Sequence, residues 1–315
     1  PRDLHSFPTR RSSDLELNVF TCVEESATAE QVAERMSGCP RATRMLLDAL
    51  VSLGVLTKSG KEYSNTAMAS RHLTDSSAAN LRPSMLHDVH RWQTWSNLTG
   101  RIQGLVQPEQ HRALDPDRHR ALLAMLDRKS VDRAPKLLGA IGTAGVRQVL
   151  DLGGGSGAYS IAFARENEDV EAVVFELPQT APITQEYILR SGLEDRVKVR
   201  AGDFLSEDLG AGHDLILLFS ITHLLGEEDN QDLLARCHRA LALGGRVAIH
   251  DHIMDADRTG PRAGAIFALN MLLATPGGGT YSDLEYGAWL RAAGFGAMER
   301  RDVPGEPTAL LIATR

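Results

Sequence analysis

Residues 147–160, RQVLDLGGGSGAYS, contain the residue types and spacing best suited to chemistry. The segment from Gln148 to Asp151 is apolar enough to form a short buried strand, and the glycines after it let the backbone approach a ligand closely. A helix that begins at Ala158 would offer the same ligand its unpaired N–H groups. A strand, a glycine loop and a helix in this order form a nucleotide site at the carboxyl end of the strand.

The glycine spacing alone does not identify the nucleotide, because Gly153-x-Gly155-x-x-Ala158 also fits a dinucleotide site. Asp151 stands two residues before the first of these glycines. A carboxylate at this place suits a cationic amino group, whereas it would repel a pyrophosphate. Asp151 therefore favours S-adenosylmethionine over NAD as the cofactor.

Two more acids are expected at the ends of the next two strands. Glu176 can accept hydrogen bonds from ribose hydroxyls, which both kinds of cofactor require. Gly202, Asp203 and Phe204 place a carboxylate and an aromatic ring where they can bind the amino group and the face of adenine. Each acid alone could be an ordinary turn residue, but together they predict one cofactor site at a single sheet edge. Ser220 ends the following strand and belongs to the same site.

The composition is that of a soluble globular protein, with 315 residues, 43% hydrophobic and 24% charged. The net charge of −7 argues against a nucleic-acid partner held by its phosphates. The three cysteines are scattered without paired metal spacing, which indicates a reduced, cytoplasmic protein. No apolar run reaches the length of a membrane span, so we expect no membrane partner.

The N-terminal part divides into a segment that we set aside and a small domain. Residues 5–15 match the translation of a common sequencing adapter, so residues 1–15 are excluded from the expected fold as foreign. Residues 16–80 are expected to form a winged-helix dimerisation domain.

This small domain is predicted from two helices and a hairpin. Thr28 and Gln31 form a capping box that opens the first helix, and apolar residues over 42–53 share one face of the second. Residues 56–65 alternate around Ser59-Gly60 as a hairpin does. The second helix is too apolar for a helix that only reads DNA, so we expect it to form a dimer contact.

Linking helices are expected over residues 81–145, one of them over 85–105 and another over 118–138. The cofactor-binding domain should then occupy residues 146–315. Its strands alternate with helical segments, which predicts a Rossmann-like parallel sheet covered on both faces. The expected strands are 147–152, 171–176, 196–201, 214–220 and 245–251, followed by a closing antiparallel hairpin of 297–303 and 308–314.

At this point the chain resembles a known family. The segments LDLGGGSG, FELPQ, AGDF, the ITH after the fourth strand and GGRVAIHD occur together in this order. They resemble the S-adenosylmethionine-dependent O-methyltransferases of plant phenylpropanoid, acetylserotonin and bacterial polyketide pathways. The resemblance covers residues 16–315 and implies a class I methyltransferase sheet of seven strands, a homodimer and a small hydroxylated substrate.

The resemblance also implies roles for residues. Gly153 and Gly155 would approach the methionine part of the cofactor, and His223 falls on the family's catalytic base. Asp251 falls where the family places an acid beside this histidine, and it is shorter than the usual Glu. Thr280 replaces a second family acid, which weakens the expected base assembly.

Three residues are expected at the substrate. Met271 matches a residue that clamps the substrate ring in relatives, and Asn270 beside it could form a hydrogen bond with a substrate. Trp92 lies on an expected linking helix and could reach the same pocket, although core or dimer packing is the more ordinary role for such a residue.

A metal site is not expected. His250 and His252 share one face of a strand while Asp251 points to the other, so the three side chains cannot converge on an ion. Methyl transfer from a sulfonium also needs no Lewis acid.

Alternative functions stay open at this stage. Relatives of this family include enzymes that methylate nitrogen or carbon and proteins that do not methylate, and Thr280 keeps these alternatives in view. A winged-helix regulator that uses the sheet as a ligand sensor is a hypothesis of a different class. Only Arg41 and Arg44 are strongly basic in the second helix, and the acidic net charge opposes this hypothesis.

Overall fold

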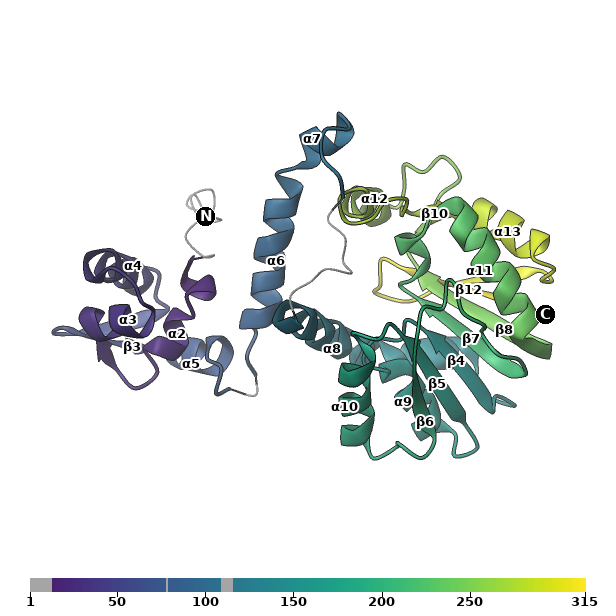
Figure 1. Cartoon of the computed structure of the whole chain (residues 1–315), viewed down its shortest axis with the longest axis horizontal. Coiled ribbons are helices and arrows are strands. Elements are labelled where there is room, and N and C mark those ends of the chain that lie inside the picture. The colour runs from purple at the N-terminus through teal and green to yellow at the C-terminus, as the bar shows by residue number, and fades with distance from the viewer. Residues whose placement is uncertain (1–12, 78, 109–115) are drawn as a thin grey trace. The chain divides into compact units, whose positions relative to one another are not determined.

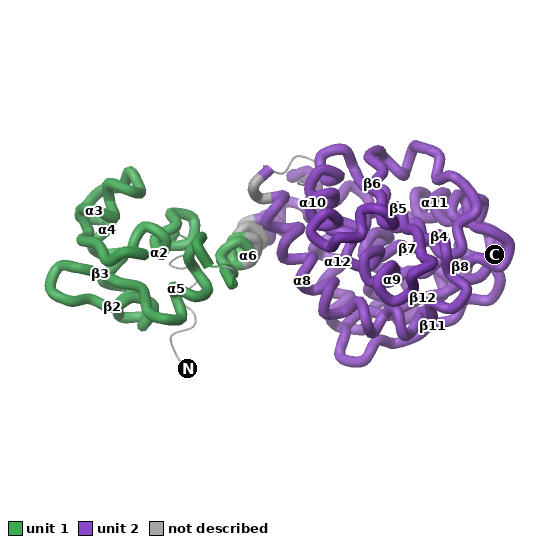
Figure 2. The backbone as a smooth tube through the Cα atoms, turned by 90° about the horizontal axis from the view of Figure 1, so that it is seen from below, with its two compact units in different colours: residues 1–93 green, residues 94–315 purple. Residues whose placement is uncertain are grey.

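The computed structural model describes residues 13–77, 79–108 and 116–315. The chain divides into two compact units, residues 1–93 and residues 94–315, which are green and purple in Figure 2. Each unit has an apolar core of its own, so each is described by itself. Within the described ranges no helix is both long and apolar enough to cross a membrane.

The first unit is a small helical domain with a three-stranded sheet in the order β1–β3–β2. Its elements are α2 (Val19–Cys22), β1 (Ala27–Thr28), α3 (Ala29–Arg35), α4 (Pro40–Ser52), β2 (Leu56–Ser59), β3 (Glu62–Asn65) and α5 (Ala67–Leu73). The capping box of α3 forms as expected: the Thr28 hydroxyl accepts from the Gln31 N–H, and the Gln31 side chain accepts from the Thr28 N–H at 2.9 Å. The expected hairpin is also present, with β2 antiparallel to β3.

The first unit begins to pack before residue 16. Residues 13–16 are helical, and the Leu15 side chain lies in the core of this unit with 2% of its surface exposed. The Arg82 Nε donates a hydrogen bond of 2.7 Å to the Leu15 carbonyl. Residues 1–12, the rest of the segment that we set aside, lie outside the described residues.

Three helices follow: α6 (Arg82–Trp95), α7 (Leu98–Ile102) and α8 (Pro116–Ile141). The single helix expected over 85–105 is interrupted at Ser96 and Asn97. The Asn97 N–H donates to the Thr94 carbonyl at 3.0 Å, three residues back, so the α-helical bond pattern stops there.

The second unit is built on a seven-stranded sheet in the order β11–β12–β8–β7–β4–β5–β6 (Figure 1). The pairs β4–β5, β5–β6, β4–β7 and β7–β8 are parallel, whereas β12 is antiparallel to both β8 and β11. This confirms the predicted fold class, including the closing hairpin. The strands are β4 (Gln148–Leu152), β5 (Glu171–Glu176), β6 (Val197–Ala201), β7 (His213–Phe219), β8 (Leu241–Asp251), β11 (Met298–Asp302) and β12 (Ala309–Thr314).

Helices cover both faces of this sheet, as Figure 1 shows. One core cluster joins the sheet to α8, α9 (Ala158–Glu166) and α10 (Ala181–Ser191). The opposite cluster joins it to α11 (Glu227–Ala240) and α13 (Asp283–Ala292). From β4 the chain adds β5 and β6 on one side of β4, and it then adds β7 and β8 on the other side. The strand order therefore reverses between β4 and β7, and open α/β sheets bind ligands at such a point.

Strand β8 starts earlier than expected. The sequence predicts a helix that ends near residue 242 and a strand from 245, but α11 ends at Ala240 and β8 begins at Leu241. The pairing with β7 jumps from His213↔Leu241 to Leu215↔Arg246, so the extra residues bulge. Gly244, with φ of 78°, turns the backbone there as few other residues can.

Shorter elements complete the second unit. They are a 3-10 turn, η3 (Thr222–Leu224), the helix α12 (Arg262–Ala274) and a pair of parallel two-residue strands, β9 (Ile253–Met254) and β10 (Tyr281–Ser282). The turn η3 directly follows β7 and therefore lies at the carboxyl edge of the sheet.

Candidate active site

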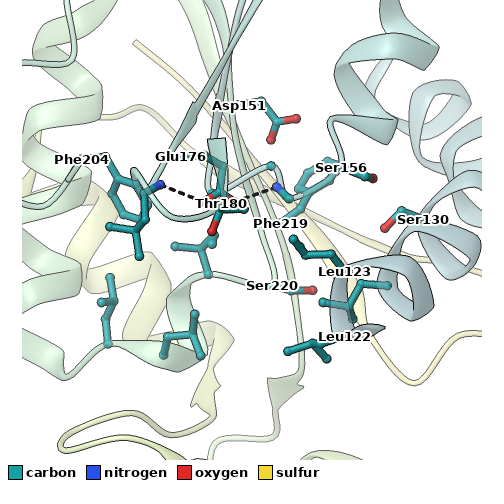
Figure 3. A pocket seen from close by; sticks show the side chains of 18 of the residues that line it. Leu122, Leu123, Ser130, Asp151, Ser156, Glu176, Thr180, Phe204, Phe219 and Ser220 are labelled. Carbon is teal, nitrogen blue, oxygen red and sulfur yellow. Dashed lines mark hydrogen bonds between the residues drawn. The ribbon is translucent and has the colours of Figure 1, made fainter. Parts of the chain in front are cut away.

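A cavity of about 580 Å³ lies at the carboxyl ends of β4, β5, β6 and β7 (Figure 3). Most residues predicted to bind the cofactor line it, and these are Asp151, Gly153, Gly155, Glu176, Asp203, Phe204 and Ser220. Gly202 does not line the cavity; its N–H donates to the Glu176 carbonyl at 2.9 Å and joins the two neighbouring loops. Among the side chains labelled in Figure 3, Phe204 and Ser130 lie at opposite sides, so the cavity extends between these two residues.

The glycine loop passes closely around the first acid. Gly155 has φ of 61°, a conformation that L side chains rarely adopt. A Cβ atom built on Gly154 would lie 2.5 Å from the Asp151 Oδ2, so only glycine lets the loop approach this carboxylate. Because its glycines carry no side chains, the loop exposes its own backbone to a ligand along one side of the cavity.

The Asp151 carboxylate is buried and only partly satisfied. The Ser160 hydroxyl donates to its Oδ2 at 2.8 Å, while its Oδ1 has no hydrogen-bond partner among the described residues. Burial raises the pKa of Asp151 to about 7. An orphaned carboxylate oxygen beside a cavity fits a cationic ligand group, which would compensate the burial of the charge.

Glu176 joins the glycine loop to the end of β5. Its Oε1 accepts from the Gly155 N–H at 2.8 Å and its Oε2 from the Leu177 N–H at 2.9 Å, drawn dashed in Figure 3. Burial raises the pKa of this carboxyl. A carboxylate has about four acceptor sites, so the backbone leaves capacity for two hydroxyls of a ribose.

The adenine end of the expected site is built from the loop after β6. The Phe204 ring is buried and meets the edge of Phe175 with centroids 6.3 Å apart. The Asp203 Oδ1 accepts from the Leu205 N–H at 3.1 Å, and Glu207 accepts from the Asp203 N–H at 2.8 Å. These bonds fix the loop, so the ring of Phe204 is pre-organised against one wall of the cavity.

Sequence reasoning missed one wall of the cavity, which α8 provides. The α8 residues that line it are His119, Leu122, Leu123, Leu126, Asp127, Lys129, Ser130 and Arg133. His119 Nε2 lies 3.1 Å from the Thr180 hydroxyl, which joins α8 to the loop before α10. The pattern of α8 predicts a helix packed on the sheet but carries no motif that distinguishes packing from ligand contact.

His223 and Asp251, predicted from the resemblance, are in direct contact. The Nδ1 of His223 on η3 lies 2.8 Å from the Oδ1 of Asp251 at the end of β8. Asp251 also accepts from the Thr222 hydroxyl at 2.8 Å, the His223 N–H at 3.2 Å and the His252 N–H at 2.8 Å. Burial opposes its charged form, but the His223 ring and these donors together hold the pKa of Asp251 below its ordinary value.

The His223 ring is held from several sides. Its carbonyl accepts from the Gly279 N–H at 3.0 Å, and its ring meets the edge of Phe267 with centroids 4.9 Å apart. His223 does not line the 580 Å³ cavity, whereas its neighbours Ile221 and Leu224 do. Because Asp251 engages Nδ1, Nε2 is the ring nitrogen available to take a proton.

Thr280, which replaces the second family acid, takes no part in this pair. Its hydroxyl donates to the Gly264 carbonyl at 3.4 Å in a buried place. The hydrogen bonds of Asp251 given above therefore come from other residues.

Asn270 and Met271, which are predicted at the substrate, do not line the described cavity. Asn270 Oδ1 accepts from the Trp95 Nε1 at 2.5 Å, and the Met271 side chain is buried on the same helix, α12. Trp92 lies on α6 in the first unit with 64% of its side chain exposed. Trp95 was missed, because nothing in its sequence neighbourhood indicates a partner far along the chain.

His250 and Asp251 at the end of β8 have different partners, and the His252 ring, one residue beyond the strand, packs on Phe267. His250 is fully buried, with Nε2 2.8 Å from the Thr308 hydroxyl, whereas Asp251 bonds His223. Among the described residues no three His, Cys, Asp or Glu side chains are grouped closely enough to hold a metal ion.

Comparisons with known proteins agree with this geometry. The model of the O-methyltransferase domain matches residues 100–296, and that of the O-methyltransferase dimerisation domain matches residues 12–75. The chain is similar to a 3-hydroxy-5-methyl-1-naphthoate 3-O-methyltransferase from Streptomyces sahachiroi, 31% identical over 85% of this chain and 79% of the relative. It is also 31% identical to the tetracenomycin polyketide synthesis 8-O-methyl transferase TcmO from Streptomyces glaucescens, over 94% of this chain and 90% of the relative.

A solved structure shows the same fold with a cofactor product. The structure titled "PigF with SAH" aligns with 99% of this chain and 96% of its own, with a TM-score of 0.82 and 25% identity. The domain model covers more than half of the chain, and the glycine loop, orphaned acid and ribose-type carboxylate suit the cofactor. The chain therefore belongs to the O-methyltransferase family and is a methyltransferase that depends on S-adenosylmethionine.

Proposed function

We propose that this enzyme transfers a methyl group to a hydroxyl of a small aromatic or polyketide-like natural product, with His223 as the general base. The observation that carries the proposal is the His223–Asp251 pair, 2.8 Å apart and buried at the sheet edge. Asp251 fixes the tautomer that leaves Nε2 as acceptor, so His223 can take the proton of a hydroxyl placed beside it. One named relative is an O-methyltransferase of a hydroxynaphthoate and the other is an O-methyltransferase of tetracenomycin polyketide synthesis, which supports this acceptor class.

The cofactor residues divide by the part of S-adenosylmethionine that each would hold. Asp151 faces the ammonium, Glu176 the ribose hydroxyls, and Asp203 with Phe204 the adenine. Gly153, Gly155 and Ser220 shape the walls, and Gly202 joins the loop after β6 to the end of β5. The cofactor supplies an electrophilic methyl group when it is bound. The chain's own part is to hold the acceptor oxygen in line and to remove its proton, and correct orientation is a large share of the acceleration.

The dimerisation domain supports a homodimer, which sedimentation equilibrium of the purified protein would test. Asn270, Met271 and Trp92 remain proposed substrate residues. Asn270 keeps its amide N–H groups for a substrate, since the Trp95 bond uses its oxygen.

The proposed acceptor class is tested with a matched pair of compounds. We expect methylation of 2-naphthol, detected by mass spectrometry as one added methyl group, and little methylation of 2-naphthylamine under the same conditions. The pair differs only in the acceptor atom, so it separates oxygen from nitrogen transfer. A product from the amine alone, or a methyl on a ring carbon, would instead establish one of the alternative methyl transfers.

The raised pKa of Asp151 predicts a pH-dependent cofactor affinity. Below pH 7 the ligand-free carboxyl is largely protonated, and an ammonium beside it favours the ionised form, so binding releases a proton. We expect the Kd of S-adenosylhomocysteine to fall by up to about tenfold per unit as pH rises from 5 to 7, and then to level off. Calorimetry in two buffers of different ionisation enthalpy measures the released proton directly.

Two variants identify the group that releases this proton. Asp151→Asn should bind more weakly and lose the pH dependence. Glu176→Gln is the control, because burial also raises the pKa of Glu176 and it is the other acid of the cavity with this shift. If Asp151→Asn keeps the wild-type pH dependence, Asp151 does not face the ammonium.

A further inference from the structure

A chain of buried hydrogen bonds continues behind the His223–Asp251 pair. The Thr222 Oγ1 lies 2.8 Å from the Asp251 Oδ2 and 2.6 Å from the Tyr286 hydroxyl. Thr222 and Tyr286 are fully buried, and Tyr286 comes from α13, on the face of the sheet that α11 also covers. Two polar side chains that meet no solvent and no ligand need a reason to be there.

The number of protons fixes the direction of this chain. Asp251 accepts from four donors, so it is an ionised carboxylate and donates nothing. Thr222 has a single hydroxyl proton, which it gives to Asp251, and its oxygen must therefore accept from the Tyr286 hydroxyl. Burial raises the pKa of Tyr286 well above its ordinary value, so this tyrosine keeps its proton.

We propose that Thr222 and Tyr286 are positioning residues that hold the Asp251 carboxylate in the plane that presents Oδ1 to His223. The proposal rests on the base function proposed for His223. Thr222 fixes Oδ2, and Tyr286 fixes Thr222, so the carboxylate cannot rotate away from the imidazole. This support comes from a place other than that of the second family acid, where Thr280 bonds Gly264.

The same turn is held at its backbone by another set of bonds. Asn230 Nδ2 donates to the Thr222 carbonyl at 3.0 Å, and the Tyr281 hydroxyl donates to the Leu225 carbonyl at 2.5 Å. These bonds fix where η3 lies, whereas the Thr222 hydroxyl fixes how Asp251 is turned. Removing the hydroxyl alone therefore tests positioning while the fold of the turn keeps its own support.

Conservative variants isolate each hydroxyl. Tyr286→Phe keeps the ring, which packs against Trp289 with centroids 5.4 Å apart, and removes only the donor to Thr222. Thr222→Val keeps the shape and removes the donor to Asp251, and Thr222→Ser restores that donor. Ordinary thermal unfolding curves would show that each variant is folded.

The first readout is the ¹⁵N-histidine NMR spectrum of the ligand-free protein, which reports the tautomer and the hydrogen bonds of the His223 ring and needs no acceptor. The groups that face this ring are Asp251, His252 and the apolar Phe267. His223→Gln and His252→Gln assign the signals. Without the Thr222 donor the carboxylate can turn away from the imidazole, so we expect the His223 ring signals of Thr222→Val to move toward those of a mixture of the two neutral tautomers, and those of Thr222→Ser to stay as in the wild type.

The second readout is turnover of 2-naphthol, or of whichever arene of the matched pair is methylated. We expect kcat to fall about tenfold to a hundredfold in Thr222→Val and about threefold to tenfold in Tyr286→Phe, with the KM of the acceptor unchanged. Thr222→Ser should recover most of the rate. A merely structural role would move KM, cofactor affinity and kcat together.

The outcomes separate this inference from the proposed function. If Thr222→Val and Tyr286→Phe both fold and keep the wild-type His223 ring signals, the positioning role is overturned. If Thr222→Val does not fold, Tyr286→Phe decides, and wild-type ring signals and kcat in that variant overturn the role. If His223→Ala turns over at the wild-type rate, the proposed base function of His223 is rejected, independently of the result for Tyr286→Phe.

Discussion

The His223→Ala variant should lose about 10²–10⁴-fold in kcat while it binds S-adenosylhomocysteine as tightly as the wild type. The reason is that the proposed proton acceptor and the proposed cofactor-binding residues are different groups. The imidazole is bonded to Asp251 at 2.8 Å, outside the lining of the cofactor cavity, so its removal takes away the proton acceptor and leaves the cofactor walls intact. Steady-state turnover of the methylated arene and calorimetry with S-adenosylhomocysteine measure the two quantities separately.

His252→Gln is the matched control for this prediction. The His252 ring also packs on Phe267, with centroids 4.4 Å apart, but only its backbone N–H bonds Asp251, and the variant keeps that N–H. We expect kcat to change by less than about threefold, because a substitution that leaves the His223–Asp251 bond in place should have only a small effect. Equal losses in both variants would mean that the loss reflects packing around Phe267, and unchanged turnover in His223→Ala would remove the base role.

The Gly278→Ala variant should be nearly as damaging, although Gly278 does not line the cofactor cavity. A Cβ atom at this position would lie 2.3 Å from the His223 carbonyl oxygen and 3.0 Å from the Leu224 carbonyl carbon. Both are backbone atoms, so the turn that carries the base must move. A misplacement of about 1 Å in a catalytic group can lower the rate about 10²-fold, and we expect a loss of this order in kcat.

Gly279→Ala separates this steric effect from a general effect of the glycine turn. Its Cβ would meet nothing closer than 3.9 Å, and its N–H would still donate to the His223 carbonyl. We expect near wild-type kcat for Gly279→Ala and a lower unfolding temperature only for Gly278→Ala, since overpacking destabilises by about 1–3 kcal/mol. Similar losses in both variants would contradict the proposed clash.

The sequence predicts much of the fold because the signals for it are local. The glycine loop, the Thr28–Gln31 capping box and the strand pattern each depend on residues within one element and its turn. The residues proposed to bind the cofactor lie close together for the same reason, since each stands at the end of a strand or in the loop after it, and parallel strands end at one edge. Asp251 and His223 were paired through the family resemblance, because they lie 28 residues apart.

The residues that sequence reasoning missed depend on tertiary packing. Trp95 meets Asn270 across 175 positions, and Tyr286 meets Thr222 across 64, so no spacing rule relates either pair. The break at Ser96 and Asn97 and the early start of β8 coincide with a backbone bond between residues three apart and with a bulge. Apolar periodicity detects none of these effects.

The helix α12, which carries Asn270 and Met271, and the turn that carries the proposed base, His223, are joined by short contacts. Thr275 donates to the Met271 carbonyl at 2.8 Å and accepts from the Gly278 N–H at 2.8 Å, and the next residue, Gly279, bonds the His223 carbonyl. Efforts to engineer the acceptor range of this enzyme through α12 should therefore also disturb the turn that carries His223. Libraries that vary α12 while keeping Thr275 and the glycines unchanged should retain more active members than libraries that extend into the turn.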